Sequence, residues 1–104
     1  VITLYPDFFP GPLSASVTGR ALKEKIWSLE VIDLRQIGRG VHNQVDDKPI
    51  SGGPGMILKP DVLDEALLSA NGSIGEKNSL TVCMSPKGSP LTQDVAKTLA
   101  CSRR

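Results

Sequence analysis

The spacing of apolar residues changes several times between a strand-like period of two and a helical period, and this alternation constrains the fold most. Strand-like runs cover residues 1–4, 27–34, 56–58 and 80–84, and helix-like segments cover residues 16–26, 60–72 and 92–101. The run Leu80–Met84 is mostly apolar, which is typical of a buried strand. Strands that alternate with helices predict an α/β fold with a mostly parallel sheet and flanking helices.

The helical segments also carry signals for their ends and their buried faces. Gly19 interrupts the first helix, Pro60 and Gly72 suit the start and the stop of the second, and Thr92 can cap the third, with Asp94 near its positive end. The expected buried positions are Val17, Ala21, Leu22 and Ile26 in the first helix and Val62, Leu63, Ala66, Leu67 and Ala70 in the second.

Charge and composition exclude several classes of function. The net charge of +1 argues against a strong positive field across the whole chain, so any contact with nucleic acid must be local, and we expect no DNA partner. Two cysteines and the single His42 lack the spacing of a zinc site, so we expect no metal and reduced thiols. The reduced thiols favour a cytoplasmic protein, and because no run of about 18 apolar residues exists, we expect no membrane partner.

The ends of the sequence predict that it is part of a longer chain. It begins at Val1, directly in a strand-like run and without an initiator Met, which favours processing or truncation at this end. A layered α/β domain would return to its sheet after the helix at residues 92–101, but the sequence stops at Arg104.

The long segment from residue 35 to residue 55 contains the strongest chemical signal. Gly52, Gly53 and Gly55 lie within four positions, so the backbone can approach a ligand closely and present N–H groups to an anion such as a phosphate. The preceding Asp46 and Asp47 can accept hydrogen bonds from a base edge or hold basic side chains. The same composition also fits a solvated surface loop, and both interpretations stay open.

A second signal follows the predicted strand at residues 80–84. The turn Ser85-Pro86-Lys87-Gly88 lies at the carboxyl end of that strand, where ligands bind in open α/β sheets. An ordinary strand-to-helix turn is an equally good interpretation. Cys83 and His42 do not form a convincing nucleophile and base, because a thiol within an apolar strand is usually inert.

Several short motifs follow one another along nearly the whole chain. They are Leu4-Tyr5-Pro6-Asp7-Phe8-Phe9, Val17-Thr18-Gly19-Arg20-Ala21, Asp33-Leu34-Arg35, His42 followed by Val45-Asp46-Asp47-Lys48-Pro49, Gly52-Gly53-Pro54-Gly55-Met56, and Ser85-Pro86-Lys87-Gly88 with Leu91 and Gln93. In order and spacing these motifs resemble the bacterial tRNA (guanine-N1)-methyltransferases. The sequence departs from that pattern at Ile50-Ser51, where the family usually has Tyr-Gly, and at Lys87, where Gln is common.

The resemblance implies a homodimeric α/β-knot (SPOUT) enzyme that transfers a methyl group from S-adenosylmethionine to N1 of the guanine just 3′ of the anticodon of tRNA. It implies that residues 1–104 are the N-terminal part of the catalytic domain, without the knot, the general-base aspartate or the C-terminal tRNA-binding domain. This portion alone is therefore expected to be inactive, with no catalytic residue of its own. The alternative is a non-catalytic α/β binding or structural module whose glycine-rich loop faces a phosphate.

The resemblance also assigns roles to individual residues. Arg20 and Arg35 become candidates for structural or RNA-backbone contacts. The implied cofactor-binding residues are Met84, Ser85, Pro86 and Gly88, and the implied RNA-binding residues are Asp46, Asp47, Gly52, Gly53, Gly55 and Met56.

Overall fold

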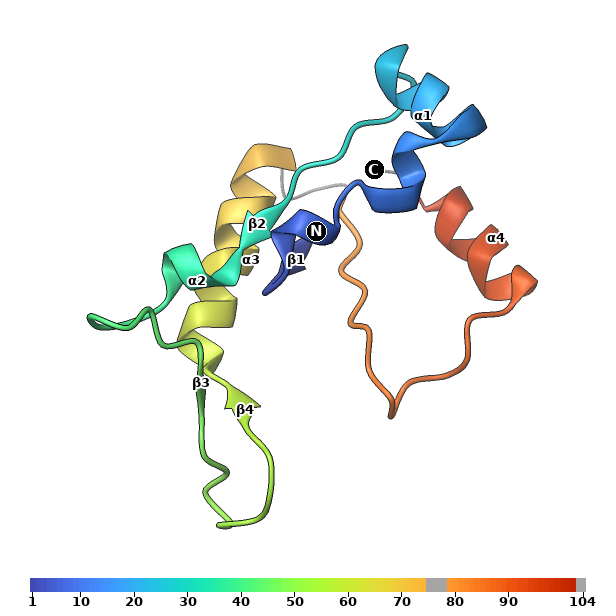
Figure 1. Cartoon of the computed structure of the whole chain (residues 1–104). Coiled ribbons are helices and arrows are strands. Elements are labelled where there is room, and N and C mark those ends of the chain that lie inside the picture. The colour runs from blue at the N-terminus through green and yellow to red at the C-terminus, as the bar shows by residue number, and fades with distance from the viewer. Residues whose placement is uncertain (75–78, 103–104) are drawn as a thin grey trace. The chain divides into compact units, whose positions relative to one another are not determined.

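The computed structural model of the chain describes residues 1–74 and 79–102. The chain divides into two compact units, residues 1–70 and residues 71–104, and each is described by itself. Short strands and helices alternate along the chain (Figure 1). The strands are β1 (Ile2–Thr3), β2 (Ile32–Asp33), β3 (Asp46–Asp47) and β4 (Ile57–Leu58); the helices are α1 (Ser16–Lys23), α2 (Leu34–Ile37), α3 (Pro60–Ile74) and α4 (Gln93–Cys101), with 3-10 turns at Pro6–Phe8 and Gly11–Ser14.

The core of the first unit forms where β1 and β2 lie beside α3 (Figure 1). The two strands pair in parallel, with Ile2 opposite Ile32 and Thr3 opposite Asp33. The predicted stripe of the second helix is correct, because Val62 and Ala66 are its most buried members. The core cluster consists of Leu34, Val45, Val62 and Ala66, with Ile2, Leu4, Ile32 and Ile37 packed against it.

The predicted α/β class is confirmed, and the pairing of the strands is mixed. β3 and β4 pair antiparallel, while β1 and β2 are parallel. The segment at residues 35–55 has more structure than its lack of a period predicts, because Arg39 and Gln44 form an isolated bridge ahead of β3. Val45, which is buried, anchors this segment in the core.

The strand predicted for residues 27–34 is wrong in its extent. Only Ile32 and Asp33 pair, because β1 offers a partner of just two residues. Trp27 instead ties the chain back to the first helix, since its indole N–H donates to the carbonyl of Thr18 at 3.0 Å. The alternating apolar pattern therefore reflects contacts other than a strand ladder.

The first helix ends earlier than its apolar pattern predicts, and two of the residues expected to be buried are exposed. α1 stops at Lys23 rather than Ile26, and both Val17 and Ile26 are exposed, at 76% and 72%, where burial was expected. Gly19 is the buried residue of this helix, and a Cβ there would lie 1.9 Å from the carbonyl oxygen of Ser14. The glycine does not interrupt the helix; it permits close packing on the preceding 3-10 turn.

The second unit lacks the buried strand that the run Leu80–Met84 predicts. This segment has no regular secondary structure, and Leu80, Val82 and Met84 are exposed, as is Cys83. Within the described part of this unit no second strand is present to pair with it, and an apolar run forms a strand only against a partner. The expectation that Cys83 packs within a buried strand is therefore also wrong, and both cysteines are free and exposed.

The last helix agrees with its sequence signals. The hydroxyl oxygen of Thr92 accepts a hydrogen bond from the N–H of Val95 at 3.3 Å, and Asp94 lies in the first turn. The favourable capping and dipole interactions expected at residues 92–101 are thus present.

Among the helices in the described parts of the chain, none is long and apolar enough to cross a membrane.

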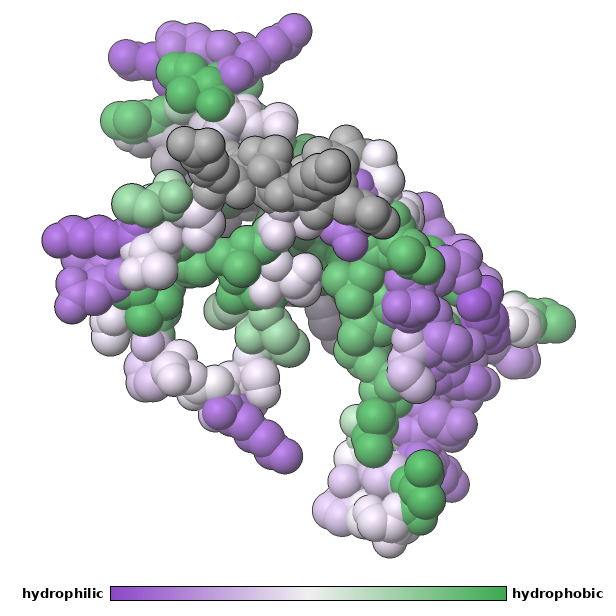
Figure 2. All heavy atoms as spheres, turned by 180° about the vertical axis from the view of Figure 1, so that it is seen from behind, coloured by the Kyte–Doolittle hydropathy of each residue, from purple (hydrophilic) through white to green (hydrophobic). Residues whose placement is uncertain are grey.

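Apolar side chains are not confined to the core, and Figure 2 shows them among charged side chains on the surface. Val41 and Ile50 are almost completely exposed in the segment around β3, and Met84 is 86% exposed. The core of the first unit is therefore the small cluster around α3, and these other apolar positions contribute little to it.

Candidate functional site

The two strands β3 and β4 form a hairpin that holds the candidate RNA-binding residues. Asp46 lies opposite Leu58 and Asp47 opposite Ile57, and the N–H of Lys59 donates to the carbonyl of Val45 at 2.8 Å. Because Val45 is buried, the ladder begins at the core and ends in the loop of residues 48–56. The aspartates therefore lie at the ordered base of the loop, not within it.

The carboxylates of Asp46 and Asp47 are directed to different sides of the hairpin. Successive side chains of a strand point to opposite faces, and Asp46 is half-buried while Asp47 is exposed. One oxygen of Asp47 accepts the backbone N–H of Lys48 at 2.8 Å. Neither carboxylate forms an ion pair within residues 1–74 and 79–102, so Asp47 can accept further hydrogen bonds from a partner.

The loop of residues 48–56 leaves open space beside Gly52 and Gly55. The N–H of Gly52 donates to the carbonyl of Pro49 at 2.9 Å, which closes a turn. Gly52 and Gly55 have φ angles of +69° and +95°, and no atom lies within 4 Å of the position that a Cβ would occupy. These two glycines are required for backbone direction, and the loop surface of Gly53 and Met56 is likewise exposed.

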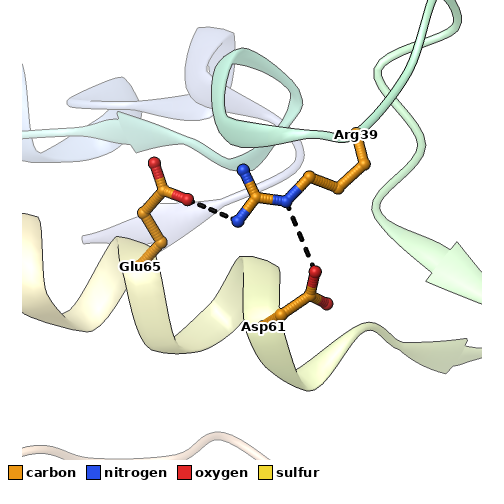
Figure 3. Close-up of polar contacts among 3 residues, drawn as sticks. All are labelled: Arg39, Asp61 and Glu65. Atoms are coloured by element: carbon orange, nitrogen blue, oxygen red, sulfur yellow. Dashed lines mark hydrogen bonds and ion pairs between the residues drawn. The ribbon is translucent and has the colours of Figure 1, made fainter.

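Arg39 joins the base of the hairpin to α3 (Figure 3). Its Nε lies 3.3 Å from Oδ2 of Asp61, and its Nη2 lies 2.6 Å from Oε2 of Glu65. The backbone of Arg39 exchanges two hydrogen bonds with Gln44, at 3.0 and 2.8 Å. This arginine therefore fixes the segment that leads into Asp46, and its charge is engaged by two carboxylates.

The ion pairs shift the pKa values of Arg39 and Asp61. Hydrogen bonds to Glu65 and then to Asp61 raise the pKa of Arg39 above its usual value. Desolvation alone would raise the pKa of Asp61, but hydrogen bonds from Arg39 and from the N–H of Val62 outweigh it, so this pKa is lowered. Asp61 and Glu65, four residues apart on a helix, lie on one face and are a local signal for a cationic partner, but the sequence does not specify that this partner is Arg39.

The candidate cofactor residues form a tight turn in the second unit. The N–H of Gly88 donates to the carbonyl of Ser85 at 2.9 Å, and the N–H of Lys87 donates to Oγ of Ser85 at 3.2 Å. A Cβ on Gly88 would lie 3.2 Å from the carbonyl oxygen of Ser85, which is a tight contact. The turn that the sequence predicts is present, with Met84 exposed beside it.

The two arginines that the resemblance singles out have different surroundings. Arg35 donates from Nη1 to the carbonyl of Leu4, and its guanidinium carbon lies 5.6 Å from the centroid of the Tyr5 ring. Arg20 is exposed in the last turn of α1. Only Arg35 is therefore oriented by other parts of the first unit.

His42 and the acidic residues do not assemble a metal site in the part of the chain that the structure describes. No group of three or more His, Cys, Asp or Glu side chains is placed there to hold a metal ion. His42 is exposed in the turn between Arg39 and Gln44. The RNA-facing candidates belong to the first unit and the cofactor-facing candidates to the second.

Comparison with known proteins identifies relatives of the whole chain. The family model described as "tRNA (Guanine-1)-methyltransferase TrmD" matches residues 1–104. A tRNA (guanine-N(1)-)-methyltransferase of Ehrlichia canis is 50% identical over 99 residues, which cover 92% of this chain and 40% of that protein. The enzyme of the same description from Jannaschia sp. is 47% identical over 105 residues, covering 99% of this chain and 42% of the relative.

A solved structure supports the same relationship. The crystal structure of tRNA (m1G37) methyltransferase from Aquifex aeolicus matches with a TM-score of 0.82 and 28% sequence identity, and the match covers 99% of this chain. That match covers only 45% of the solved chain, so this sequence spans less than half the length of its relatives. The resemblance stated from the motifs is confirmed.

Proposed function

The chain belongs to the tRNA (guanine-1)-methyltransferase family, and on this premise we propose that the protein containing it methylates N1 of a guanine in tRNA. The methyl donor in this proposal is S-adenosylmethionine, and the target is the guanine just 3′ of the anticodon. The observation that carries the proposal is the match of the family model to every residue from 1 to 104. The solved relative from Aquifex aeolicus is a tRNA (m1G37) methyltransferase, which is the same modification.

We further propose that residues 1–104 are the N-terminal part of the catalytic α/β-knot domain of a cytoplasmic homodimer. The support is that the chain covers 40% and 42% of two relatives. In this proposal the knot, the general base and the C-terminal tRNA-binding domain lie outside these residues. The 104 residues alone should then transfer no methyl group to tRNA.

The chemistry needs few functional groups but precise placement. When bound, S-adenosylmethionine supplies an electrophilic methyl group on a sulfonium centre. The protein must hold the target nitrogen in line with that methyl group and accept the N1 proton of guanine. The residues of this chain serve the first requirement, and the proton acceptor is proposed to lie elsewhere.

The turn at residues 85–88 fits one wall of a donor pocket. Its backbone is closed by the hydrogen bond between Gly88 and Ser85, which leaves little room for a side chain at Gly88. Met84 presents an exposed thioether, a polarisable group that can pack against an adenine ring. Met84, Ser85, Pro86 and Gly88 would hold the donor, while the open hairpin loop would lie against the RNA.

In the hairpin, Asp47 is the carboxylate best placed for a base edge. It is exposed, and carboxylate oxygens accept hydrogen bonds from the N–H groups of bases. Asp46 is half-buried on the other face and would orient the hairpin instead. Gly52, Gly53, Gly55 and Met56 would give the RNA close access to the backbone.

Transfer of labelled methyl from S-adenosylmethionine to an unmodified tRNA transcript, with nucleoside mass spectrometry of the product, tests the proposal. The full-length protein should form 1-methylguanosine. Asp47→Ala should lower the rate by more than tenfold with little change in Tm, whereas Asp64→Ala, an exposed position on α3, should leave both unchanged. RNA binding without any methyl transfer would contradict the proposal and favour a binding module.

Calorimetric titration tests the donor wall separately. Gly88→Val should weaken S-adenosylmethionine binding more than tenfold, because the added side chain must displace the Ser85 carbonyl or occupy the donor space. Lys87→Gln, which restores the residue common in the family, is the matched control and should leave the dissociation constant unchanged. An unchanged constant for Gly88→Val would show that the turn is only a connector.

A further inference from the structure

A pocket outside the sites proposed above lies where the first two strands end. Its volume is about 410 Å³, and it is lined by residues 4–8 together with Asp33 and Arg35. Because β1 and β2 are parallel, their carboxyl ends lie at the same edge. Residues 4–8 follow the end of β1, and Asp33 and Arg35 lie at the end of β2. Ligands of open α/β sheets bind outside the carboxyl ends of the strands, so the position itself favours a binding site.

Two aromatic rings form an exposed wall of this pocket. The side chain of Phe8 is 71% exposed and that of Tyr5 is 59% exposed, and their ring centroids lie 5.8 Å apart with an interplanar angle of 57°. One face of Tyr5 is covered by the guanidinium of Arg35. Phe8 therefore offers the free ring surface, on which a planar group can stack.

Arg35 supplies positive charge that is not neutralised by an ion pair. Asp7 and Asp33 line the same pocket, but in the described part of the chain neither forms a salt bridge with it. One guanidinium N–H group is used on the carbonyl of Leu4, and the side chain of Asp33 accepts the backbone N–H of Arg35 at 2.9 Å. The remaining guanidinium donors can bind a phosphate.

The combination of groups selects the ligand. A simple anion would be repelled by Asp7 and Asp33, a simple cation by Arg35, and an apolar ligand would leave the Asp7 carboxylate and the remaining Arg35 donors unused. A nucleotide satisfies each group, since its base stacks on an aromatic ring, its amino groups donate to carboxylates and its phosphate binds arginine.

We propose that this pocket binds a nucleotide in a single-stranded segment of the RNA substrate. The base stacks on Phe8, Asp7 accepts hydrogen bonds from its amino edge, and Arg35 binds the adjoining phosphate. The proposal rests on the proposed function, because it assumes an RNA substrate, but it adds a contact separate from the hairpin and the donor turn.

Binding of the full-length protein to a fluorescent tRNA transcript and to a single-stranded oligonucleotide of its anticodon loop tests the stacking contact. Phe8→Ala should raise both dissociation constants by about tenfold, within the range expected for loss of one stacked base. Phe8→Tyr, which keeps the ring, should bind as the wild type does. Ile26→Ala removes an apolar side chain of similar exposure outside the pocket and should have no effect.

The salt dependence of binding tests the phosphate contact. Arg35→Gln should reduce the slope of log affinity against log salt by about one, and Arg35→Lys should restore it. A purely structural role on the Leu4 carbonyl would lower Tm without changing that slope. Lys23→Gln removes an exposed positive charge outside the pocket and should leave the slope unchanged.

The possible outcomes separate this inference from the proposed function. If the wild type forms 1-methylguanosine but Phe8→Ala binds RNA with unchanged affinity, the pocket does not bind a nucleotide. If Phe8→Ala instead lowers Tm strongly at unchanged RNA affinity, another part of the longer protein covers the rings, and the inference is wrong. If the wild type methylates no tRNA, the proposed function fails whatever the variants do.

Discussion

Gly19 and Gly38 lie in closely packed backbone, whereas Gly52 and Gly55 lie in an open loop. A Cβ at Gly19 would meet the carbonyl oxygen of Ser14 at 1.9 Å, and one at Gly38 would meet that of Asn43 at 2.3 Å. At Gly52 and Gly55 nothing lies within 4 Å, but both φ angles are positive. The first pair is required for space and the second for backbone direction.

This difference separates the part of the first unit that carries stability from the part that is available to a partner. Gly19 allows α1 to pack on the preceding turn, and Gly38 allows the segment before β3 to close on itself. The loop of residues 48–56 buries little and contacts little, so its substitutions should act mainly on function.

Gly19→Ala should lower the free energy of unfolding by about 3 kcal/mol, because the added methyl group meets main-chain atoms that cannot move aside alone. Urea denaturation of the full-length protein measures this change. Gly72→Ala is the matched control, since Gly72 lies in α3 with nothing within 4 Å, and there the change should be neutral or stabilising by up to about 1 kcal/mol. Equal effects at both positions would contradict the packing argument.

Gly52→Ala should cost about 1 kcal/mol of stability, the strain of a left-handed backbone for a residue with a Cβ. Gly52→Asn should cost less, because asparagine tolerates this conformation. Both changes should lower the rate of methyl transfer strongly while lowering Tm only slightly. Parallel measurements of Tm and of activity on the full-length protein would show this. A large loss of Tm without loss of turnover would place this loop with the packed region.

Elements with local signals were predictable from the sequence, and elements set by distant contacts were not. Thr92 caps α4 as predicted, and Val62 and Ala66 are buried in α3 as their spacing predicts. Local hydrogen bonds and helical periodicity depend only on neighbouring residues. The hairpin that orders Asp46 depends on pairing with β4, eleven residues further along, and no local pattern specifies that pairing.

The errors have the same physical origin. The apolar run at residues 80–84 predicts a strand, but a strand needs a partner, and the described part of the second unit supplies none. The position of the candidate donor turn was nevertheless predictable, because Pro86 and Gly88 favour a turn in any context. Arg39 was missed because its role depends on Asp61 and Glu65, which only folding brings close.

The ion pairs of Arg39 with α3 make the stability of the closely packed region sensitive to pH. The pKa of Asp61 is lowered by folding, so the unfolded chain binds more protons in acid. The contribution of this pair is therefore complete above the ordinary carboxyl pKa and is lost as pH falls through the lowered value. Arg39→Gln should lower Tm slightly at neutral pH and have no effect once Asp61 is protonated.

Thermal melts of the wild type and of Arg39→Gln, from neutral pH down to pH values at which carboxyl groups are protonated, measure this change. The two Tm values should become equal in acid. The pairs are about half exposed, so high salt should also reduce the difference at neutral pH. Arg20→Gln, with no ion pair in the described part of the chain, should show neither dependence. A difference in Tm that persists in acid would mean that Arg39 acts through packing, not charge.

Lys25 gives the smallest and most specific test, because it combines a positive φ with a side chain. Its φ is +58°, its N–H donates to Leu22 at 3.1 Å, and the N–H of Ile26 donates to Ala21 at 2.9 Å. This is a Schellman end of α1, in which glycine is preferred at the position of Lys25. Lys25→Gly should stabilise the protein by about 0.5 kcal/mol, because relief of left-handed strain exceeds the added entropy of the unfolded chain. Lys23→Gly removes the same charge within the helix and should instead destabilise the protein by about 1 kcal/mol. Changes of opposite sign in the free energy of unfolding, measured by urea denaturation, would confirm that backbone direction decides the effect. A loss of stability in both variants would refute it.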